Sequence, residues 1–163
     1  MYSQIRTSML DGICAMPVQV EVDISMGMPV FDMVGYLSPE VREAKERVRT
    51  ALHNCGILLP AKRITVNLSP ANIRKTGTGF DLPIAVALLV AMGLVKQEKC
   101  ADTIFSGELN LSGQLLPVRG ILPVPPVSSS ASSFFSLLKS KLSRNNCAGA
   151  LLSSKYMSIL CWS

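Results

Sequence analysis

The residues that most resemble a chemical site form a glycine-bearing loop, Arg74-Lys75-Thr76-Gly77-Thr78-Gly79, directly before an expected helix. Free backbone N–H groups and the positive end of a helix dipole attract anions, so such a loop could bind phosphate. The phosphate-binding loop of nucleotide hydrolases has the pattern G-x-x-x-x-G-K-[ST], in which the lysine follows the glycines. Here Lys75 precedes Gly77, and the pattern occurs nowhere in the chain. We therefore interpret the loop as a tight connection and expect no ATP hydrolysis by this chain.

The residue types present argue against a hydrolytic triad and against a metal site. His53 is the one histidine, no G-x-S-x-G motif is present, and the carboxylates show no spacing that singles out an acid–base pair. The five cysteines are odd in number and include no C-x-x-C pair. This pattern argues against a zinc site and a secreted disulfide framework, and it is typical of a reducing cytosol. We expect a cytoplasmic protein with no metal and no cofactor of its own.

Basic residues offer a different chemistry, the binding of nucleic-acid phosphates. Lys62, Arg63, Arg74 and Lys75 flank one expected strand and the loop after it, and they could meet DNA if that loop lies beside the start of the strand. The alternative is that they are scattered surface charges. Net charge does not decide between the two, because residues 1–123 carry 12 basic and 11 acidic side chains, a net of +1. Most of the chain's +5 belongs to the residues that follow.

The elements that must position these residues can be predicted from the spacing of apolar side chains. Val18 to Ile24 alternates apolar and polar residues and predicts a strand with one buried face. Val30 to Val34 predicts a second strand after a Gly-Met-Pro break, and Ile64 to Leu68 predicts a third. Residues 69–80 are polar and contain glycine, so we expect a loop there.

A first helix is expected from Ser38-Pro39-Glu40, which combines a capping hydroxyl, a proline at the first helical position and an acid in the first turn. Its charged side can form a Glu43–Arg47 pair, and Gly56 is its expected stop. We interpret that side as a solvated face, with a docking face for a neighbouring domain as the alternative. The apolar stripe comprises Val41, Ala44, Val48, Ala51, Leu52 and Cys55, and the charged side comprises Arg42, Glu43, Lys45, Glu46, Arg47 and Arg49.

A second helix is expected from Leu82 to about Met92, with Asp81 as its cap and Gly93 at its end. It is apolar nearly all round, so it should pack against a sheet or between layers. Residues 108–116 predict a hairpin with a two-residue Ser-Gly turn. The order β-β-α-β-α-β-β is that of an α/β or α+β domain ending near residue 123.

Residues 124–163 have a different composition, with 12 serines in 40 residues, four basic side chains and no acid. We interpret them as an irregular tail outside the fold, an out-of-register or truncated product. A short anchoring helix for a partner or a membrane surface is the alternative. The longest uncharged apolar run, Leu82 to Val95, is 14 residues, which is too short to span a bilayer. No apolar signal-peptide core opens the chain, so we expect no membrane association.

Three stretches carry a specific resemblance to a known family. They are VEVDISMGMPVFDMVGYLSPEVREAKERVRTAL (20–52), LPAKRITVNLSPANIRKTGTGFDLPIAVALL (59–89) and FSGELNLSGQLLPVRGILP (105–123). Together they resemble the N-terminal domain of the YifB/ComM group of magnesium-chelatase-like AAA+ ATPases. The resemblance covers nearly all of residues 1–123 and does not extend to the tail.

That N-terminal domain is similar to the proteolytic domain of Lon proteases, a two-layer α/β sandwich of the ribosomal protein S5 domain 2-like type. Lon-type enzymes use a serine–lysine dyad. The resemblance places Gly79, or in a shifted register Asp81, at the serine and Leu122 at the lysine. Glycine and leucine cannot act as nucleophile or base, so peptidase activity is not expected. A displaced dyad of Ser69 or Ser106 with a lysine is a third hypothesis, and the lysines nearest to them in sequence are Lys75 and Lys99 respectively.

The resemblance also implies what the longer family members contain. A downstream AAA+ module would bind ATP and Mg²⁺ and form a ring, and the ComM group is associated with DNA processing during transformation. We expect this chain to be a non-catalytic domain, truncated before that module, which positions or regulates the ring. The alternative is a stand-alone nucleic-acid-binding module that uses the Lys62/Arg63/Arg74/Lys75 cluster.

Overall fold

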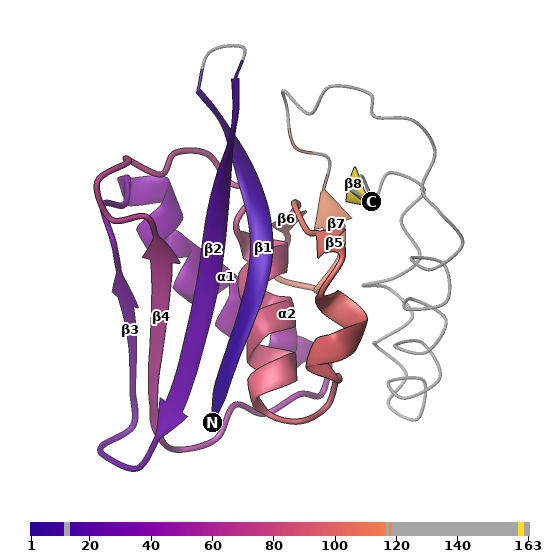
Figure 1. Cartoon of the computed structure of the whole chain (residues 1–163). Helices are drawn as coiled ribbons and strands as arrows, with labels where there is room; N and C mark the ends of the chain where they lie inside the picture. The colour runs from indigo at the N-terminus through magenta and orange to yellow at the C-terminus, as the bar shows by residue number, and fades with distance from the viewer. Residues whose placement is uncertain (12–13, 117, 119–159, 162–163) are drawn as a thin grey trace.

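The computed structural model describes residues 1–11, 14–116, 118 and 160–161. Its main feature is a mixed sheet whose strands follow the order β3-β4-β2-β1-β5-β8, with a separate two-stranded hairpin, β6-β7 (Figure 1). Neighbours are antiparallel except β3 with β4 and β1 with β5. The strands are β1 (Tyr2–Asp11), β2 (Cys14–Ser25), β3 (Val30–Val34), β4 (Arg63–Ser69), β5 (Thr103–Ile104), β6 (Glu108–Leu109), β7 (Leu115–Leu116) and β8 (Leu160–Cys161).

Helices α1 (Pro39–Asn54) and α2 (Asp81–Ala91) lie on one face of this sheet (Figure 1). The side chains of β2 that face them, such as Val20 and Val22, are buried, while Glu21 and Asp23 point the other way and are at least partly exposed. This alternation is the period of two that the sequence shows. The α+β class predicted from the sequence is therefore confirmed.

Strand β1 was not predicted. It pairs along its whole length with β2, from Tyr2 opposite Asp23 to Asp11 opposite Cys14. Two of its inward positions, Ser3 and Thr7, are polar and buried, so the apolar alternation that marks β2 is absent. Ser3 Oγ satisfies its hydrogen-bonding capacity by donating to the carbonyl of Ala87 in α2, at 2.7 Å.

Helix α1 follows the prediction closely. Ser38 is its N-cap residue and Pro39 its first residue, and the whole predicted apolar stripe is buried. Ser38 Oγ makes no capping hydrogen bond. Gly56 has a φ of +77°, the left-handed conformation that commonly follows a helix end, and its N–H donates to the carbonyl of His53.

Helix α2 shows one correction. Asp81 is its first residue and not its cap: Phe80 precedes it as the N-cap residue, without a side-chain capping bond. Every residue of α2 is buried, as its all-round apolar character predicted. After it come a short 3-10 helix, η1 (Gln97–Cys100), and strand β5, neither of which was predicted.

The hairpin β6-β7 was predicted in the right place with the wrong turn. Gly113 N–H donates to the carbonyl of Asn110, so Leu111 and Ser112 are the central residues of the turn. Gly113 follows at φ +82°, and Asn110 N–H closes the loop by donating to Gln114 O. This is a three-residue loop with a left-handed glycine, which is also common in hairpins.

The predicted tail, 124–163, lies outside the described residues except for Leu160 and Cys161, which pair with β5. Among the helices of the described part of the chain, none is long and apolar enough to cross a membrane.

Candidate functional site

The start of α2 is held by an ion pair between Asp81 and Arg47 of α1. Arg47 Nε donates to Asp81 Oδ2 at 2.8 Å and Arg47 Nη2 donates to Oδ1 at 2.9 Å, so the contact is bidentate. The Asp81 side chain is 0% exposed and that of Arg47 is 20% exposed. The predicted Glu43–Arg47 pair is present at 3.7 Å. The predicted solvated face is nevertheless wrong at Arg47, because its main partner lies 34 residues away and is buried.

A third group joins this contact from the hairpin. The N–H of Leu109, in β6, donates to Asp81 Oδ2 at 3.1 Å. One residue earlier in the hairpin, the carboxylate of Glu108 accepts a hydrogen bond from Thr78 Oγ1, in the loop before α2. The start of α2 is thus connected to α1 on one side and to β6 on the other.

Two opposing effects act on the Asp81 carboxyl. Its burial raises the pKa above the ordinary aspartate value, while the guanidinium of Arg47 and the N–H of Leu109 favour the ionised form and limit that rise. The hydrogen bond to Asp81 raises the pKa of Arg47. Because a bidentate arginine lies against the carboxylate, we infer that both groups are charged at neutral pH.

Gly79, the first position matched to the Lon-type serine, has no room for a side chain. A Cβ atom built on Gly79 would lie 2.8 Å from Ser106 Oγ and 3.5 Å from a methyl group of Val118. Gly107 N–H donates to Gly79 O at 3.0 Å, which holds the two segments together. Asp81, the second matched position, is engaged by Arg47. Leu122, matched to the lysine, lies outside the described residues.

Lys75 is fully buried inside the loop that precedes α2. Its Nζ donates to the backbone carbonyls of Pro70 and of Ile73, the latter at 2.9 Å. Its main chain is fixed as well, because Lys75 N–H donates to Tyr36 O and Ser38 N–H donates to Lys75 O. Loss of water around the amine lowers its pKa. The amine therefore orders the loop from within and does not face an external anion.

The four basic residues considered for nucleic-acid binding do not form one patch. Lys62 and Arg63 lie at the start of β4, while Arg74 and Lys75 lie beyond its other end. The seven residues of β4 separate the pairs by about 20 Å, at roughly 3.3 Å per residue. Arg63 forms an ion pair with Asp32 at 3.2 Å, and Lys75 is buried. The condition that the loop lies beside the start of the strand is not met.

The displaced dyads considered from the sequence are not assembled either. Within the residues that the structure describes, no hydrogen bond joins a serine hydroxyl to a lysine amine. Ser106 is buried while Lys99 is exposed, and the amine of Lys75 is bonded to carbonyls. The same described residues contain no group of three or more His, Cys, Asp or Glu side chains that could hold a metal ion.

Comparison with known proteins now gives the family. Over 120 residues the chain is 44% identical to YifB of Escherichia coli (strain K12), covering 74% of this chain and 24% of YifB. Over 118 residues it is 46% identical to the competence protein ComM of Haemophilus influenzae, covering 72% of this chain and 23% of ComM. Residues 20–135, more than half of the chain, match the family described as subunit ChlI of Mg-chelatase. The chain belongs to the magnesium-chelatase-like family of YifB and ComM.

The similarity extends to an uncharacterized protein of Mycobacterium tuberculosis (strain H37Rv), which is 41% identical over 106 residues, 65% of this chain and 21% of that protein. The chain spans about a quarter of the length of the first two relatives, and the match lies in their N-terminal part.

Sequence reasoning missed Arg47 as the main partner of Asp81 in this member of the magnesium-chelatase-like family. A usable signal was present. Asp81 opens a helix that is apolar on all sides, and a carboxylate drawn into such surroundings needs a cation or several hydrogen-bond donors. Arg47 was one of four arginines and lysines on α1, however, and the one partner that the sequence predicted for it was Glu43, one turn away on the same helix.

Proposed function

We propose that this chain acts as a non-catalytic N-terminal domain of a YifB/ComM-type AAA+ ATPase, and that it positions or regulates the ATPase ring. The proposal rests on the two residues at or just before the start of α2 that are matched to the Lon-type serine. The two described positions matched to a Lon-type nucleophile are a glycine packed against Ser106 and an aspartate held by Arg47. Both serve contacts within the domain, so the scaffold is retained without the chemistry.

The remaining elements of the proposal rest on family likeness. A mixed sheet with two helices on one face is compatible with the ribosomal protein S5 domain 2-like type, which we propose for residues 1–123. We propose residues 124–163 as a separate tail apart from Leu160 and Cys161, which pair with β5 of the main sheet. ATP and Mg²⁺ would be bound by the AAA+ module of the longer proteins, in a ring. The name of the competence protein ComM favours DNA processing during transformation as the process served.

The proposal can be tested with a chimaera. The segment of Haemophilus influenzae ComM that matches this chain is replaced by residues 1–118, and ring assembly and ATP hydrolysis are measured. We expect the chimaera to assemble and hydrolyse ATP at a rate comparable to ComM, and we expect this chain alone to hydrolyse none. ATP turnover by the pure chain that disappears in Lys75→Met would contradict the proposal. So would a folded chimaera that assembles no ring.

A further inference from the structure

One edge of the main sheet combines an open strand with exposed apolar side chains. In the described part of the chain β3 is hydrogen-bonded to β4 alone, so its other side presents free backbone donors and acceptors. Met26 and Met28, in the loop that leads into β3, are 84% and 85% exposed. Val30 and Val34 of β3 are also exposed. Apolar side chains gathered at an open edge are typical of an interaction surface.

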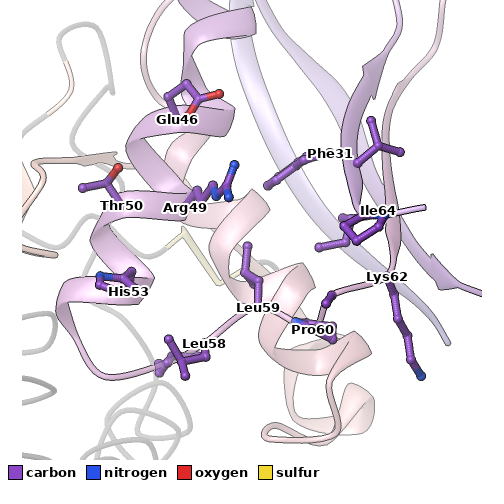
Figure 2. A pocket seen from close by; sticks show the side chains of 14 residues that line it. Phe31, Glu46, Arg49, Thr50, His53, Leu58, Leu59, Pro60, Lys62 and Ile64 are labelled. Atoms are coloured by element: carbon purple, nitrogen blue, oxygen red, sulfur yellow. The ribbon is translucent and has the colours of Figure 1, made fainter. Parts of the chain in front are cut away.

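Next to this edge lies a groove between β3, the second half of α1 and the segment that joins α1 to β4 (Figure 2). Its volume is about 470 Å³. Its apolar side is formed mainly by Phe31, Leu58, Leu59 and Pro60. Phe31 is half-buried and packs against the core, so a further apolar side chain could cover it. Leu58 is 70% exposed.

The charged residues of the groove are predominantly basic. Arg49 extends from α1 toward Phe31, and Lys62 lies at the opposite rim (Figure 2). Neither side chain forms an ion pair or hydrogen bond with any described residue, in contrast to that of Arg47, which is paired with Asp81. Glu46 is the one acidic side chain of the lining. The groove therefore offers two cations with no side-chain partner among the described residues, beside an apolar floor.

We propose that the β3 edge and this groove bind an acidic, extended peptide segment of a partner protein, which adds to β3 as a further strand. Strand addition uses main-chain hydrogen bonds for affinity and alternate side chains for specificity. Phe31 and Met33 are the β3 residues on the helix-facing side of the sheet, because they pair with the buried Ile64 and Val66. Alternate side chains of the added strand fall on the same side, apolar ones against Phe31 and a carboxylate within reach of Arg49.

Two other occupants fit less well. Symmetric antiparallel pairing of two β3 strands would centre on Asp32 and set it opposite the Asp32 of the second copy, and like charges directly opposite are unfavourable. Residues 124–163 of the same chain contain four basic side chains and no aspartate or glutamate, so they supply no side-chain carboxylate for Arg49.

The probe is a fluorescein-labelled peptide, Thr-Glu-Thr-Leu-Thr-Leu-Thr-Glu-Thr, titrated with the full chain and followed by fluorescence anisotropy. Its sequence is the same in both directions, so parallel and antiparallel addition both present a glutamate. The comparison peptide carries lysine in place of both glutamates. We expect the glutamate peptide to bind at least about tenfold more tightly than the lysine peptide, with an affinity that falls as salt is raised. Equal binding of the two peptides would overturn the proposal.

Arg49→Glu is the decisive variant, and Lys99→Glu, an equal charge change on η1, is its matched control. We expect Arg49→Glu to weaken binding of the glutamate peptide about tenfold and Lys99→Glu to leave it unchanged. Equal effects of the two variants would show nonspecific attraction and overturn the site. A dimer of the chain that the peptide dissociates, seen by analytical ultracentrifugation, would reassign the edge to a second copy.

Main-chain pairing is tested with two further peptides, N-methylated either at the threonines or at the residues between them. Only alternate N–H groups of an added strand face its neighbour. We therefore expect one methylated peptide to lose binding at least about tenfold and the other to keep it. If both bind like the parent peptide, no strand is added to β3.

Discussion

Replacing Arg47 with methionine removes the cation that faces a fully buried carboxylate. The substitution keeps the length of the apolar stem, so packing along α1 is largely preserved. Removing one member of a buried ion pair costs about 3–5 kcal/mol, because the remaining charge stays buried without compensation. Arg47 is 20% exposed and Asp81 keeps the hydrogen bond from Leu109, so we expect a loss near the lower limit, about 3 kcal/mol at pH 7.

The loss should depend on pH with a definite sign. Burial raises the pKa of Asp81, and Arg47 opposes the rise, so the folded-state pKa rises further in Arg47→Met. A carboxyl whose pKa is higher in the folded state than in the unfolded state binds more protons when folded, and stability then falls as pH rises between the two values. The variant should therefore recover stability relative to the parent as pH is lowered from 7 toward about 4, the ordinary aspartate value.

Urea unfolding, monitored by far-ultraviolet circular dichroism at pH 7, 6, 5 and 4.5, gives the loss of unfolding free energy and its dependence on pH. Arg49→Met is the matched control, because Arg49 lies on the same helix, is exposed and forms no ion pair with a described residue. We expect that control to stay within about 0.5 kcal/mol of the parent at every pH. A loss below about 1 kcal/mol in Arg47→Met, or a loss that does not change with pH, would refute the assignment of a buried ion pair.

Three further predictions concern the same region and the buried side chains. Gly79→Ala should destabilise the fold by about 1–3 kcal/mol because its Cβ meets Ser106 Oγ, and the double variant with Ser106→Ala should recover part of the loss in urea unfolding. Lys75→Met should cost about 1–3 kcal/mol by leaving two carbonyls without a donor. Burial lowers the pKa of Lys75, so the parent binds fewer protons when folded than when unfolded. The unfolding free energy of the parent relative to Lys75→Met should therefore grow as the pH is raised from 8 to 10. A difference that stays constant with pH would contradict the burial of a charged amine. Burial raises the pKa of Cys100 to about 12, so iodoacetamide at pH 8 should label Cys100 only after unfolding, as peptide mass mapping would show.

The parts of the fold that could be predicted are those with a strong local pattern. The apolar stripe of α1 and the alternation of apolar and polar residues in β2 each lie within one short segment of the sequence. Both were located correctly. Strand β1 was missed because Ser3 and Thr7 occupy inward positions, which an alternation of apolar residues cannot reveal. Ser3 is accommodated by a hydrogen bond to α2, 84 residues away, and that contact has no trace in the local sequence.

The candidate site was only partly predictable for the same reason. The family resemblance pointed to positions 79 and 81. It did not show why a glycine and an aspartate suit them. The Oγ of Ser106 beside Gly79 and the guanidinium of Arg47 beside Asp81 come from distant segments, brought together by the packing of α1, α2 and the hairpin. Lys75 was considered as a phosphate contact or as one of several scattered surface charges. Only the folded loop shows that its amine donates hydrogen bonds to two backbone carbonyls.

Whether the α2 start serves contacts within the domain or hydrolysis is tested by measuring the release of fluorescent fragments from labelled casein by the purified full chain. The parent is compared with Ser69→Ala and Ser106→Ala between pH 7 and 9. We predict no release above the buffer rate for any of the three. Release by the parent that either serine substitution abolishes would contradict it, and would place a working nucleophile in this domain.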